Sequence, residues 1–497
     1  MAHSSPLPDQ RPAHDPAQRP TEPSAGPATG SAAGPSTGSA APSAGPTSTA
    51  PRLTVRSWFV DGLSPDAPPP FAGRIPNRSI DFLSQLPASG FTCWVRGRSG
   101  LVGIGRRLRL RARGADRFHD LARQWDALTA EAQVDDRVGL LGSGLVGFSA
   151  ISFAADSAVE SVVDVPEYVL GRRDGRVWLT QVCGGEDEQA SDDAEAAPGL
   201  QLSPTPLRDQ RIVSREPGHV SPDRFEQIVE QATARLRSPE AGERKIVLAR
   251  DEVITTEDEI DVRSVLGRLN AAFPSTWAFL VAGLVGATPE LLIGVEDGAV
   301  HSRVLAGTYR VQDDPEKELV QARTHLGGRK DSVEHSYAID SLASTLGPVT
   351  EELHVDPEPH LLQLANVIHL ASDAHGRLSS RSDGSRISPF EVAHAVHPTA
   401  AVGGTPRDRA MDLISHFEEM DRGRYAGPVG WVDGYGNGQF GIALRCGQLE
   451  ARNRIRLYAG AGIMPDSDPE SERRETDAKF APMRKALGVD WDPDTSH

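Results

Sequence analysis

The chain has 497 residues, and its 52 Lys and Arg against 69 Asp and Glu give a net charge of −17, which argues against binding the polyphosphate backbone of a nucleic acid. Its three cysteines, an odd number, exclude a closed disulfide framework and a four-cysteine zinc site. Because no secretory signal opens the chain and its most apolar stretch, 277–287, is about half as long as a membrane helix, we expect a cytoplasmic protein that contacts no membrane.

Composition divides the chain into five segments. Residues 1–51 lack Val, Ile, Phe, Trp and Tyr, so they cannot bury enough apolar surface to fold, and we expect a disordered tail. Residues 52–183 are predicted to form an N-terminal β-rich part of the fold. The acidic, proline-containing segment 184–219 is predicted to be a surface loop or linker. Residues 220–490 carry the strongest patterns, and 491–497 are predicted to be a flexible tail.

The β-rich part is predicted from alternating apolar positions. Its expected strands lie near 53–60, 91–95, 144–148 and 177–180. A helix is expected over 116–133, where Phe118, Leu121, Trp125 and Leu128 recur at intervals of three or four.

The region 220–490 mixes helices and strands without a regular βαβ order, which favours an α+β fold over a doubly wound sheet. A helix is expected to start at Ser221 and Pro222, and another at Asp468 and Pro469, because a capping residue followed by proline marks a helix start. The other expected elements are strands at 245–250, 277–281 and 455–459, hairpins at 291–310 and 427–445, and helices at 262–272 and 316–346.

Two short motifs are set aside. Gly142, Gly144 and Gly147 match the glycine pattern of a dinucleotide site, but a strand pattern follows where that site needs a helix. His394 and His397 are spaced like a metal pair, yet Pro398 follows directly and no third ligand is evident nearby, so a local structural role is expected.

Two sets of carboxylates on predicted helices could form a metal site. Glu472, Glu475 and Lys479 share one face of the last helix, and Asp331 and Glu334 share one face of the helix at 316–346. If the two faces meet, their oxygens suit Mg²⁺. Both faces could equally be solvated surfaces, and spacing alone leaves these alternatives open.

The order of the motifs identifies the chain as similar to the chorismate-utilising enzymes, which include isochorismate, salicylate and anthranilate synthases. The resemblance is dense over 220–490 and faint over 52–185. Its motifs are KIVLAR at 245–250, GATPELL at 286–292, LAGT at 305–308, KDSVEH at 330–335, HL at 369–370, HPTAAVGG at 397–404, GPVGW at 427–431, ALRC at 443–446, AGAGI at 459–463, and the run from Ser467 to Lys479. This resemblance implies a fold with large antiparallel β-sheets forming a core flanked by helices.

The resemblance implies a reaction that uses water. Ammonia users carry a glutamine-like residue where this chain has Lys245, and aminodeoxychorismate synthases carry a nucleophilic lysine where it has Ala306. Lys245 is therefore expected to deprotonate water, and Glu290 matches the family's general acid. The implied activity is that of an isochorismate synthase, an isomerase of the hydroxymutase type, in which water attacks C2 of chorismate and the C4 hydroxyl leaves.

The resemblance also implies the remaining site residues. Mg²⁺ is the implied cofactor, with Glu334 and Glu475 as ligands and with Glu472 and Asp331 nearby as ligands or supporting groups. The implied substrate-binding residues are Ala306, Gly307, Thr308, Tyr425, Arg445, Gly460, Gly462 and Lys479. Arginine suits a bidentate grip on a carboxylate, and glycine lets the backbone approach a ligand closely.

Two positions depart from the family pattern. Arg473 stands where many relatives have tryptophan, and Val304 replaces a common proline, although neither change removes an implied catalytic group. The alternatives are a salicylate synthase, which also eliminates pyruvate, and a non-catalytic relative that only binds. We expect a monomer without an amidotransferase subunit. The sequence is compatible with menaquinone, siderophore or specialised-metabolite biosynthesis.

Overall fold

The computed structural model describes residues 51–60, 86–184, 200, 205–240, 242–310, 315–326, 329–356, 358–363, 367–381 and 384–489. Within these ranges the side chains of 306–308, 310, 315–317, 325, 329–334, 363, 367 and 369 are not described. The predicted tails at 1–51 and 491–497 lie outside the described residues, with the exception of Pro51. Residues 185–199 and 201–204 of the predicted linker also lie outside them.

The larger of two sheets has 13 strands. Its strands pair in the order β10 (Ile212–Pro217), β11 (Lys245–Thr256), β23 (Arg454–Ile463), β22 (Cys446–Ala451), β13 (Leu284–Thr288), β12 (Trp277–Val281), β2 (Phe91–Arg96), β3 (Ser99–Ile104), β8 (Tyr168–Arg173), β9 (Arg176–Gly184), β1 (Leu53–Phe59) and β5 (Gln133–Asp136), with β19 (Gly404–Thr405) on β11. Neighbouring strands are antiparallel, except that β1 and β5 are parallel.

The second sheet has 10 strands, all paired antiparallel. Its order is β16 (Thr350–Val355), β18 (Val367–Leu378), β15 (Ala299–Arg310), β14 (Leu291–Glu296), β21 (Gly438–Ile442), β20 (Pro428–Asp433), β6 (Val146–Ala150), β7 (Ser161–Val165) and β4 (Leu108–Ala112), with β17 (His360–Gln363) on β18. Strands from 52–183 and from 220–490 lie in both sheets, so the two regions share one core.

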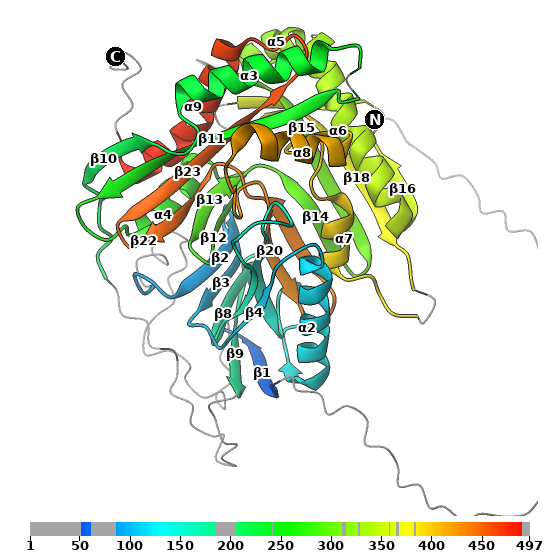
Figure 1. Cartoon of the computed structure of the whole chain (residues 1–497). Coiled ribbons are helices and arrows are strands. Elements are labelled where there is room, and N and C mark those ends of the chain that lie inside the picture. Colours follow the sequence, from blue (N-terminus) through cyan, green and yellow to red (C-terminus); the bar gives the residue numbers. More distant parts are fainter. Residues whose placement is uncertain are drawn as a thin grey trace, which may run out of the picture. The chain divides into compact units, whose positions relative to one another are not determined.

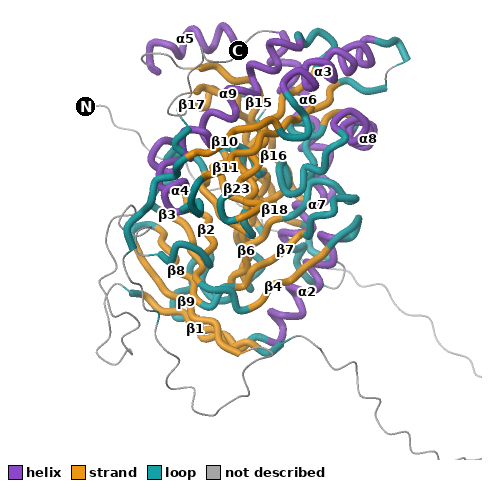
Figure 2. Tube along the Cα trace, turned by 60° about the vertical axis from the view of Figure 1, so that its left-hand side comes forward, coloured by secondary structure: helices purple, strands orange, loops and turns teal. Residues whose placement is uncertain are grey.

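Helices cover the sheets from outside. They are α2 (Arg117–Glu131), α3 (Pro222–Arg237), α4 (Val262–Ala272), α5 (Pro315–Leu326), α6 (Arg329–Leu346), α7 (Pro389–Val396), α8 (Arg407–Glu418) and α9 (Pro469–Leu487), with a 3-10 turn at Gly347–Val349. Figure 1 shows α3 and α9 side by side against β11 and β23, and Figure 2 shows the strands gathered between the helices. The predicted α+β fold is confirmed. No described helix is long and apolar enough to cross a membrane.

Two sequence predictions need correction. The single helix predicted at 316–346 is two helices, α5 and α6, separated by Gly327 and Gly328, which lie outside the described residues. Glycine is among the weakest helix formers, which explains the division. The segment 184–219, predicted as loop, contains the strand β10, which pairs with the far half of β11. Its side chains are mostly exposed, so it lacked the apolar alternation that predicts a strand.

Helix α9 is fixed to the large sheet by buried arginines. Arg250 of β11 donates to the Thr476 hydroxyl (2.7 Å) and to the Asp477 carboxylate (2.7 Å). Arg484 of α9 donates to both carboxylate oxygens of Glu252 (2.7 and 2.5 Å). Hydrogen bonds to charged groups are stronger than neutral ones, so these pairs fix how α9 sits along β11.

Candidate active site

Lys245 is the first residue of β11, and its side chain is only 1% exposed. The strand begins here because the following residues, Ile246 to Ala249, are apolar and buried on both faces. Lys245 lies opposite Thr405 of β19, while Ile246 lies opposite Ile463 of β23. The lysine that the sequence analysis expects to deprotonate water is therefore almost completely buried.

A buried ion pair supports the edge of β11 just beyond Lys245. The Ala249 amide donates to Glu418 Oε1 (2.7 Å), and Arg422 Nη2 donates to the Val247 carbonyl (2.7 Å) and to Glu418 Oε1 (2.5 Å). The side chains of Glu418 and Arg422 are 0% and 3% exposed. Along the edge of β11 between β19 and β10, this ion pair supplies hydrogen bonds that a neighbouring strand would otherwise provide. Sequence reasoning missed it, although its i, i+4 spacing was a usable signal.

We expect Arg422→Met to lower the free energy of unfolding by about 3–5 kcal/mol, because it leaves Glu418 buried without its cation. The matched control is Arg474→Met, which breaks an exposed i, i+4 pair with Glu470 and should cost no more than about 1 kcal/mol. Urea unfolding followed by tryptophan fluorescence measures both. Equal effects of the two substitutions would contradict the role given to Glu418 and Arg422.

Glu290 lies between β13 and β14 and is 5% exposed. Burial raises the pKa of its carboxyl to about 7, and the charges of Lys245, Arg445 and Lys479 limit the rise. These three cations, from three separate parts of the chain, therefore lie within electrostatic range of one carboxyl group. The chain that follows Glu290 is apolar and buried from Leu291 to Val295.

Arg445 and Tyr425 form a second side of the cluster. Arg445 has a φ of +46°, in the left-handed region, which a non-glycine residue adopts at an energetic cost and which is frequent at functional sites. Burial lowers the pKa of its guanidinium, while Tyr425, Glu475 and Glu290 oppose that change. Tyr425 is buried and stacks on Tyr458, with ring centroids 5.0 Å apart. Arg445 thus lies within electrostatic range of both Glu290 and Glu475.

The glycines of β23 lie beside this cluster. Gly460 is opposite Ala249 of β11, and its carbonyl accepts a hydrogen bond from Lys479 Nζ (2.8 Å). A Cβ atom at Gly460 would stand 3.1 Å from the Tyr425 hydroxyl and 2.9 Å from the Leu248 carbonyl. Gly462 lies two residues further along β23. The structure therefore brings Lys245, Glu290, Arg445, Lys479, Tyr425 and Gly460 into one neighbourhood.

Helix α9 presents two carboxylates in its first half. Glu472 is 2% exposed, whereas the side chain of Glu475 is 45% exposed and lies 2.5 Å from Lys479 Nζ. Their hard oxygen donors, one turn apart, fit the preference of Mg²⁺. Asp331 and Glu334 belong to α6, which packs on β15, but their side chains lie outside the described residues. The meeting of the two carboxylate sets stays a prediction.

Three of the implied substrate-binding residues, Ala306, Gly307 and Thr308, lie on β15. The register against β18 shifts between Ala306 and Thr308, so the backbone is irregular around Gly307. An irregular strand position redirects its side chains, and such positions are frequent near active sites. The side chains of 306–308 lie outside the described residues, so their contacts stay predictions.

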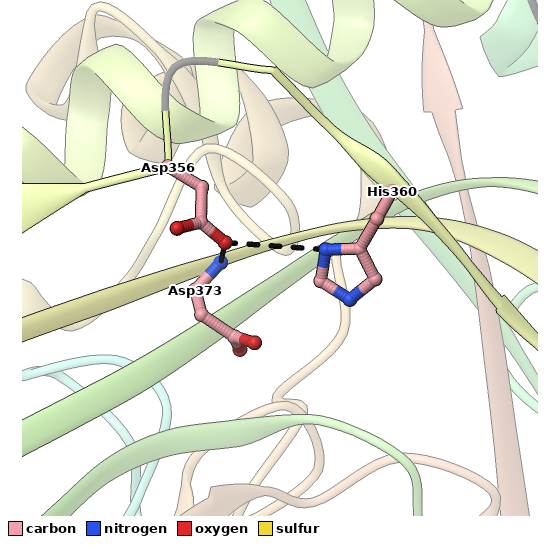
Figure 3. Close-up of side chains that lie close together, drawn as sticks. All are labelled: Asp356, His360 and Asp373. Carbon is pink, nitrogen blue, oxygen red and sulfur yellow. Dashed lines mark hydrogen bonds and ion pairs between the residues drawn. The ribbon is translucent and has the colours of Figure 1, made fainter. Parts of the chain in front are cut away.

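A different group has the composition of a metal site. In the described part of the chain, Asp356, His360 and Asp373 bring ligand atoms within 4.8 Å of one another (Figure 3). However, Arg303 donates to both carboxylate oxygens of Asp373 (2.6 and 2.8 Å), and the nearest approach of His360 to Asp356 is 3.9 Å. Because Arg303 already neutralises Asp373, we interpret the group as a surface ion-pair cluster.

The two histidines near Pro398 have structural roles. His397 ends α7, and its Nε2 donates to the Phe153 carbonyl (3.2 Å). Burial lowers the pKa of His397 to about 3. His394 packs against the Phe118 ring at 5.1 Å between centroids. Among the described residues, neither histidine belongs to a group of three or more possible metal ligands.

Thr399 is a further residue to consider at this site. Its hydroxyl is buried and has no hydrogen-bond partner among the described residues. Gly403, which bonds to the Thr399 carbonyl (2.9 Å), accepts a hydrogen bond from the Val247 amide (2.8 Å), so this loop runs beside the start of β11. An unsatisfied buried hydroxyl calls for a partner such as water or a ligand. The sequence offered no role for it beyond its place in the motif HPTAAVGG.

The chain is similar to known proteins in sequence and in fold. A model of the family "Chorismate binding enzyme" matches residues 85–488. The isochorismate synthase DhbC of Bacillus subtilis is 37% identical over 280 residues, which cover 54% of this chain and 69% of that protein. The isochorismate synthase MenF of the same organism is 29% identical over 409 residues, 78% of this chain and 85% of that protein. The solved structure of MenF, the menaquinone-specific isochorismate synthase of Escherichia coli, matches with a TM-score of 0.68 and 22% identity, covering 88% of this chain and 95% of that one. The chain belongs to the chorismate-binding enzyme family.

Proposed function

We propose that this protein is an isochorismate synthase that converts chorismate to isochorismate by attack of water at C2 with loss of the C4 hydroxyl. The observation that carries the proposal is the placement of the buried Glu290 within electrostatic range of Lys245. A site for this reaction needs one group that gives a proton and one that takes a proton. The names of the relatives that share 37% and 29% identity support the same activity.

Glu290 is the proposed general acid. The C4 hydroxyl of chorismate is a poor leaving group until it is protonated. A carboxyl group with a pKa of about 7 still holds its proton in a large fraction of molecules near neutral pH. An ordinary glutamate, with a pKa of 4.5, would be almost fully ionised there and would rarely hold a proton to donate.

Lys245 is the proposed general base, and Ala306 leaves room for the water that it deprotonates. The proton that Lys245 takes from water balances the proton that Glu290 gives to the departing hydroxyl. The charge of Lys245 lowers the pKa of Glu290, so the protonation state of Lys245 affects how readily Glu290 holds its proton. The absence of a second lysine at position 306 removes a competing nucleophile.

The remaining residues are proposed to bind the two carboxylates of chorismate. Arg445 suits a bidentate contact, and Lys479 and Tyr425 add a cation and a hydroxyl beside the backbone amides of Gly460 and Gly462. Thr308 and Gly307 are proposed to line the same space beside Ala306. Mg²⁺, held by Glu475 and Glu334 with Glu472 and Asp331 nearby, would neutralise a substrate carboxylate when bound.

We expect Gly460→Ala to lower kcat/KM for chorismate by about 10- to 100-fold, because the new methyl group displaces Tyr425 or the backbone that faces the substrate. Gly347→Ala is the control, since a Cβ atom there meets nothing within 4 Å. Steady-state kinetics on both variants, with circular dichroism to confirm folding, makes the comparison. Full activity of Gly460→Ala would remove the backbone of β23 from the proposed binding site.

Product analysis by HPLC tests the proposed function. Purified protein with chorismate and Mg²⁺ is expected to release isochorismate without salicylate or pyruvate. Salicylate with an equal amount of pyruvate would assign the protein to the salicylate synthases instead. No turnover by folded, magnesium-supplied protein would overturn the enzymatic proposal.

A further inference from the structure

The half of α9 that carries the two carboxylates of the proposed metal site is polar. Within 469–479, all of which the structure describes, the buried residues are Glu472 and Thr476. The second half instead packs apolar side chains into the core, namely Phe480, Met483, Ala486 and Leu487. Because the burial of apolar surface provides most of the stability of a helix in a protein, the position of the first half depends on polar contacts.

Arg473 supplies such a contact between α9 and α3. Its Nε donates to Glu226 Oε1 of α3 (2.6 Å), and its Nη1 donates to Asp477 Oδ2 (2.7 Å). The side chains of Arg473 and Asp477 are each 26% exposed and that of Glu226 is 36% exposed, so water partly surrounds these charges. Attraction between charges is stronger where less water lies around them. Arg473 thus binds two carboxylates, which a tryptophan at this position, with its single N–H donor, could not do.

Both carboxylates that Arg473 binds are themselves held in place. Glu226 follows Phe225, whose side chain is 0% exposed in the core beneath α3. The other oxygen of Asp477 accepts a hydrogen bond from Arg250 of β11 (2.7 Å), and Arg250 is 2% exposed. Arg473 therefore connects a well-packed helix on one side to the large sheet on the other, with α9 between them.

We propose that Arg473 is a positioning residue, which holds the first half of α9 so that Glu472 and Glu475 are ordered before a divalent cation binds. The inference rests on the proposed function, in which these two carboxylates take part in binding Mg²⁺. A guanidinium is permanently positive, so Arg473 acts on the cation only through its neighbours in α9. Ordering flexible ligands costs entropy, and a supporting contact that orders them beforehand strengthens binding.

The next residue, Arg474, provides a matched control. Arg474 pairs with Glu470 inside the same helix, and the two side chains are 68% and 57% exposed. Both arginines have the same charge and lie in the same turn between Glu472 and Glu475. They differ in that Arg473 reaches another helix. An effect that Arg473 shows and Arg474 does not is therefore due to the contact with α3, and not to the general charge near the carboxylates.

Mg²⁺ binding, measured by isothermal titration calorimetry on the full-length protein without chorismate, tests the proposal. Arg473→Gln is expected to weaken Mg²⁺ binding by about tenfold, the lower end of the usual effect of residues that support metal ligands. Glu226→Gln should weaken it similarly, and the double variant should bind no more weakly than Arg473→Gln, because both changes break one contact. Arg473→Lys, which keeps the charge but not the fork of donors, should lie between. Arg474→Gln should match the wild type.

Amide hydrogen exchange is a second readout, which needs neither Mg²⁺ nor chorismate. Exchange of the amides at 473–479 is expected to become about tenfold faster in Arg473→Gln, because the first half of α9 opens more easily. Exchange at 480–487 should stay unchanged, since apolar packing holds that half. In turnover assays the Mg²⁺ concentration for half-maximal rate should rise, while kcat at saturating Mg²⁺ stays within roughly twofold of wild type.

The outcomes separate this proposal from the proposed function. If Arg473→Gln binds Mg²⁺ as tightly as the wild type does, the proposal is overturned even where stability falls, because Arg473 then has a purely structural role. Equal losses in Arg473→Gln and Arg474→Gln would also overturn it, as would a wild type that binds no Mg²⁺. Wild type that binds Mg²⁺ but forms no isochorismate would instead contradict the proposed function, and the calorimetric comparison of the variants would still stand.

Discussion

Replacing Glu290 by glutamine is expected to reduce chorismate turnover by about 10²–10⁴-fold, the usual contribution of a positioned acid. Glutamine has nearly the same shape but cannot protonate the C4 hydroxyl. In the unchanged protein, kcat/KM is expected to fall as pH rises above about 7, because Glu290 loses its proton. Steady-state kinetics from pH 6 to 9 measure both effects. A Glu290→Gln variant with full activity would exclude Glu290 as the acid.

Glu290→Gln is expected to raise the stability of the protein although it lowers activity. This effect on stability does not depend on substrate. The folded-state pKa of Glu290 is about 7, above the ordinary value of 4.5, so folding retains a proton that the unfolded chain releases between these pH values. Its stabilising contribution is complete below about pH 4.5 and is lost as pH rises through about 7. As the pH rises from 5 to 8, the free energy of unfolding of Glu290→Gln should therefore increase relative to that of the wild type by up to about 3 kcal/mol.

The control for this stability measurement is Glu257→Gln, which removes an exposed partner of Arg211. Its difference from wild type should stay within about 1 kcal/mol across the same pH range, as for other exposed ion pairs. If Glu290→Gln shows no more pH dependence than this control, the carboxyl group of Glu290 is not held protonated by burial.

Replacing Lys245 by alanine is expected to cost a similar factor, about 10²–10⁴ in kcat, because the proposed base is lost. The charge of Lys245 also lowers the pKa of Glu290, so its removal should move the alkaline fall in stability to higher pH. A small amine such as methylamine is expected to restore part of the activity, since alanine leaves space for it. Lys485→Ala, at an exposed residue of α9, is the control.

Chemical rescue separates a catalytic role from a structural one. If Lys245→Ala folds normally and remains inactive with every small amine, while Glu290 keeps its pH dependence, Lys245 has a structural role in β11. If activity returns in proportion to the basicity of the amine, the lysine acts as the base that the proposed mechanism requires.

Local sequence signals predicted the boundaries of several elements well. The Ser221 side chain caps α3 by accepting from the Arg224 amide (3.2 Å), and Asp468 caps α9 by accepting from the Ser471 amide (2.8 Å). The helix at 262–272 was predicted at the bounds that the structure has. These elements depend on residues close in sequence, so the sequence was sufficient.

Elements that depend on distant partners were predicted incompletely. The strand expected at 245–250 continues to Thr256, through Asp251 and Glu252, which no strand pattern favours. Both carboxylates are buried and matched by arginines from elsewhere, Arg456 for Asp251 and Arg484 for Glu252. A charged residue can stay in a buried strand only with such a partner, and a single sequence does not show which residues will meet.

The candidate site also has some features that the sequence predicted and others that depend on distant partners. The identities of Lys245, Glu290, Arg445 and Lys479 came from the order of the motifs, and the structure places the three cations within electrostatic range of Glu290. The pKa of Glu290 follows from burial between strands that are distant in sequence. The supporting pair of Glu418 and Arg422 has an i, i+4 spacing that the sequence shows, but its burial against β11 depends on packing between distant elements.

Isochorismate formation in water enriched in heavy oxygen tests the central claim most directly. If water activated by Lys245 attacks C2 while Glu290 protonates the departing C4 hydroxyl, mass spectrometry will find one heavy oxygen in each product molecule, located at C2. The Lys245→Ala and Glu290→Gln variants should form almost no labelled product. Product that keeps the original oxygen of chorismate would contradict the proposed mechanism, because the hydroxyl would then have migrated without exchange with water.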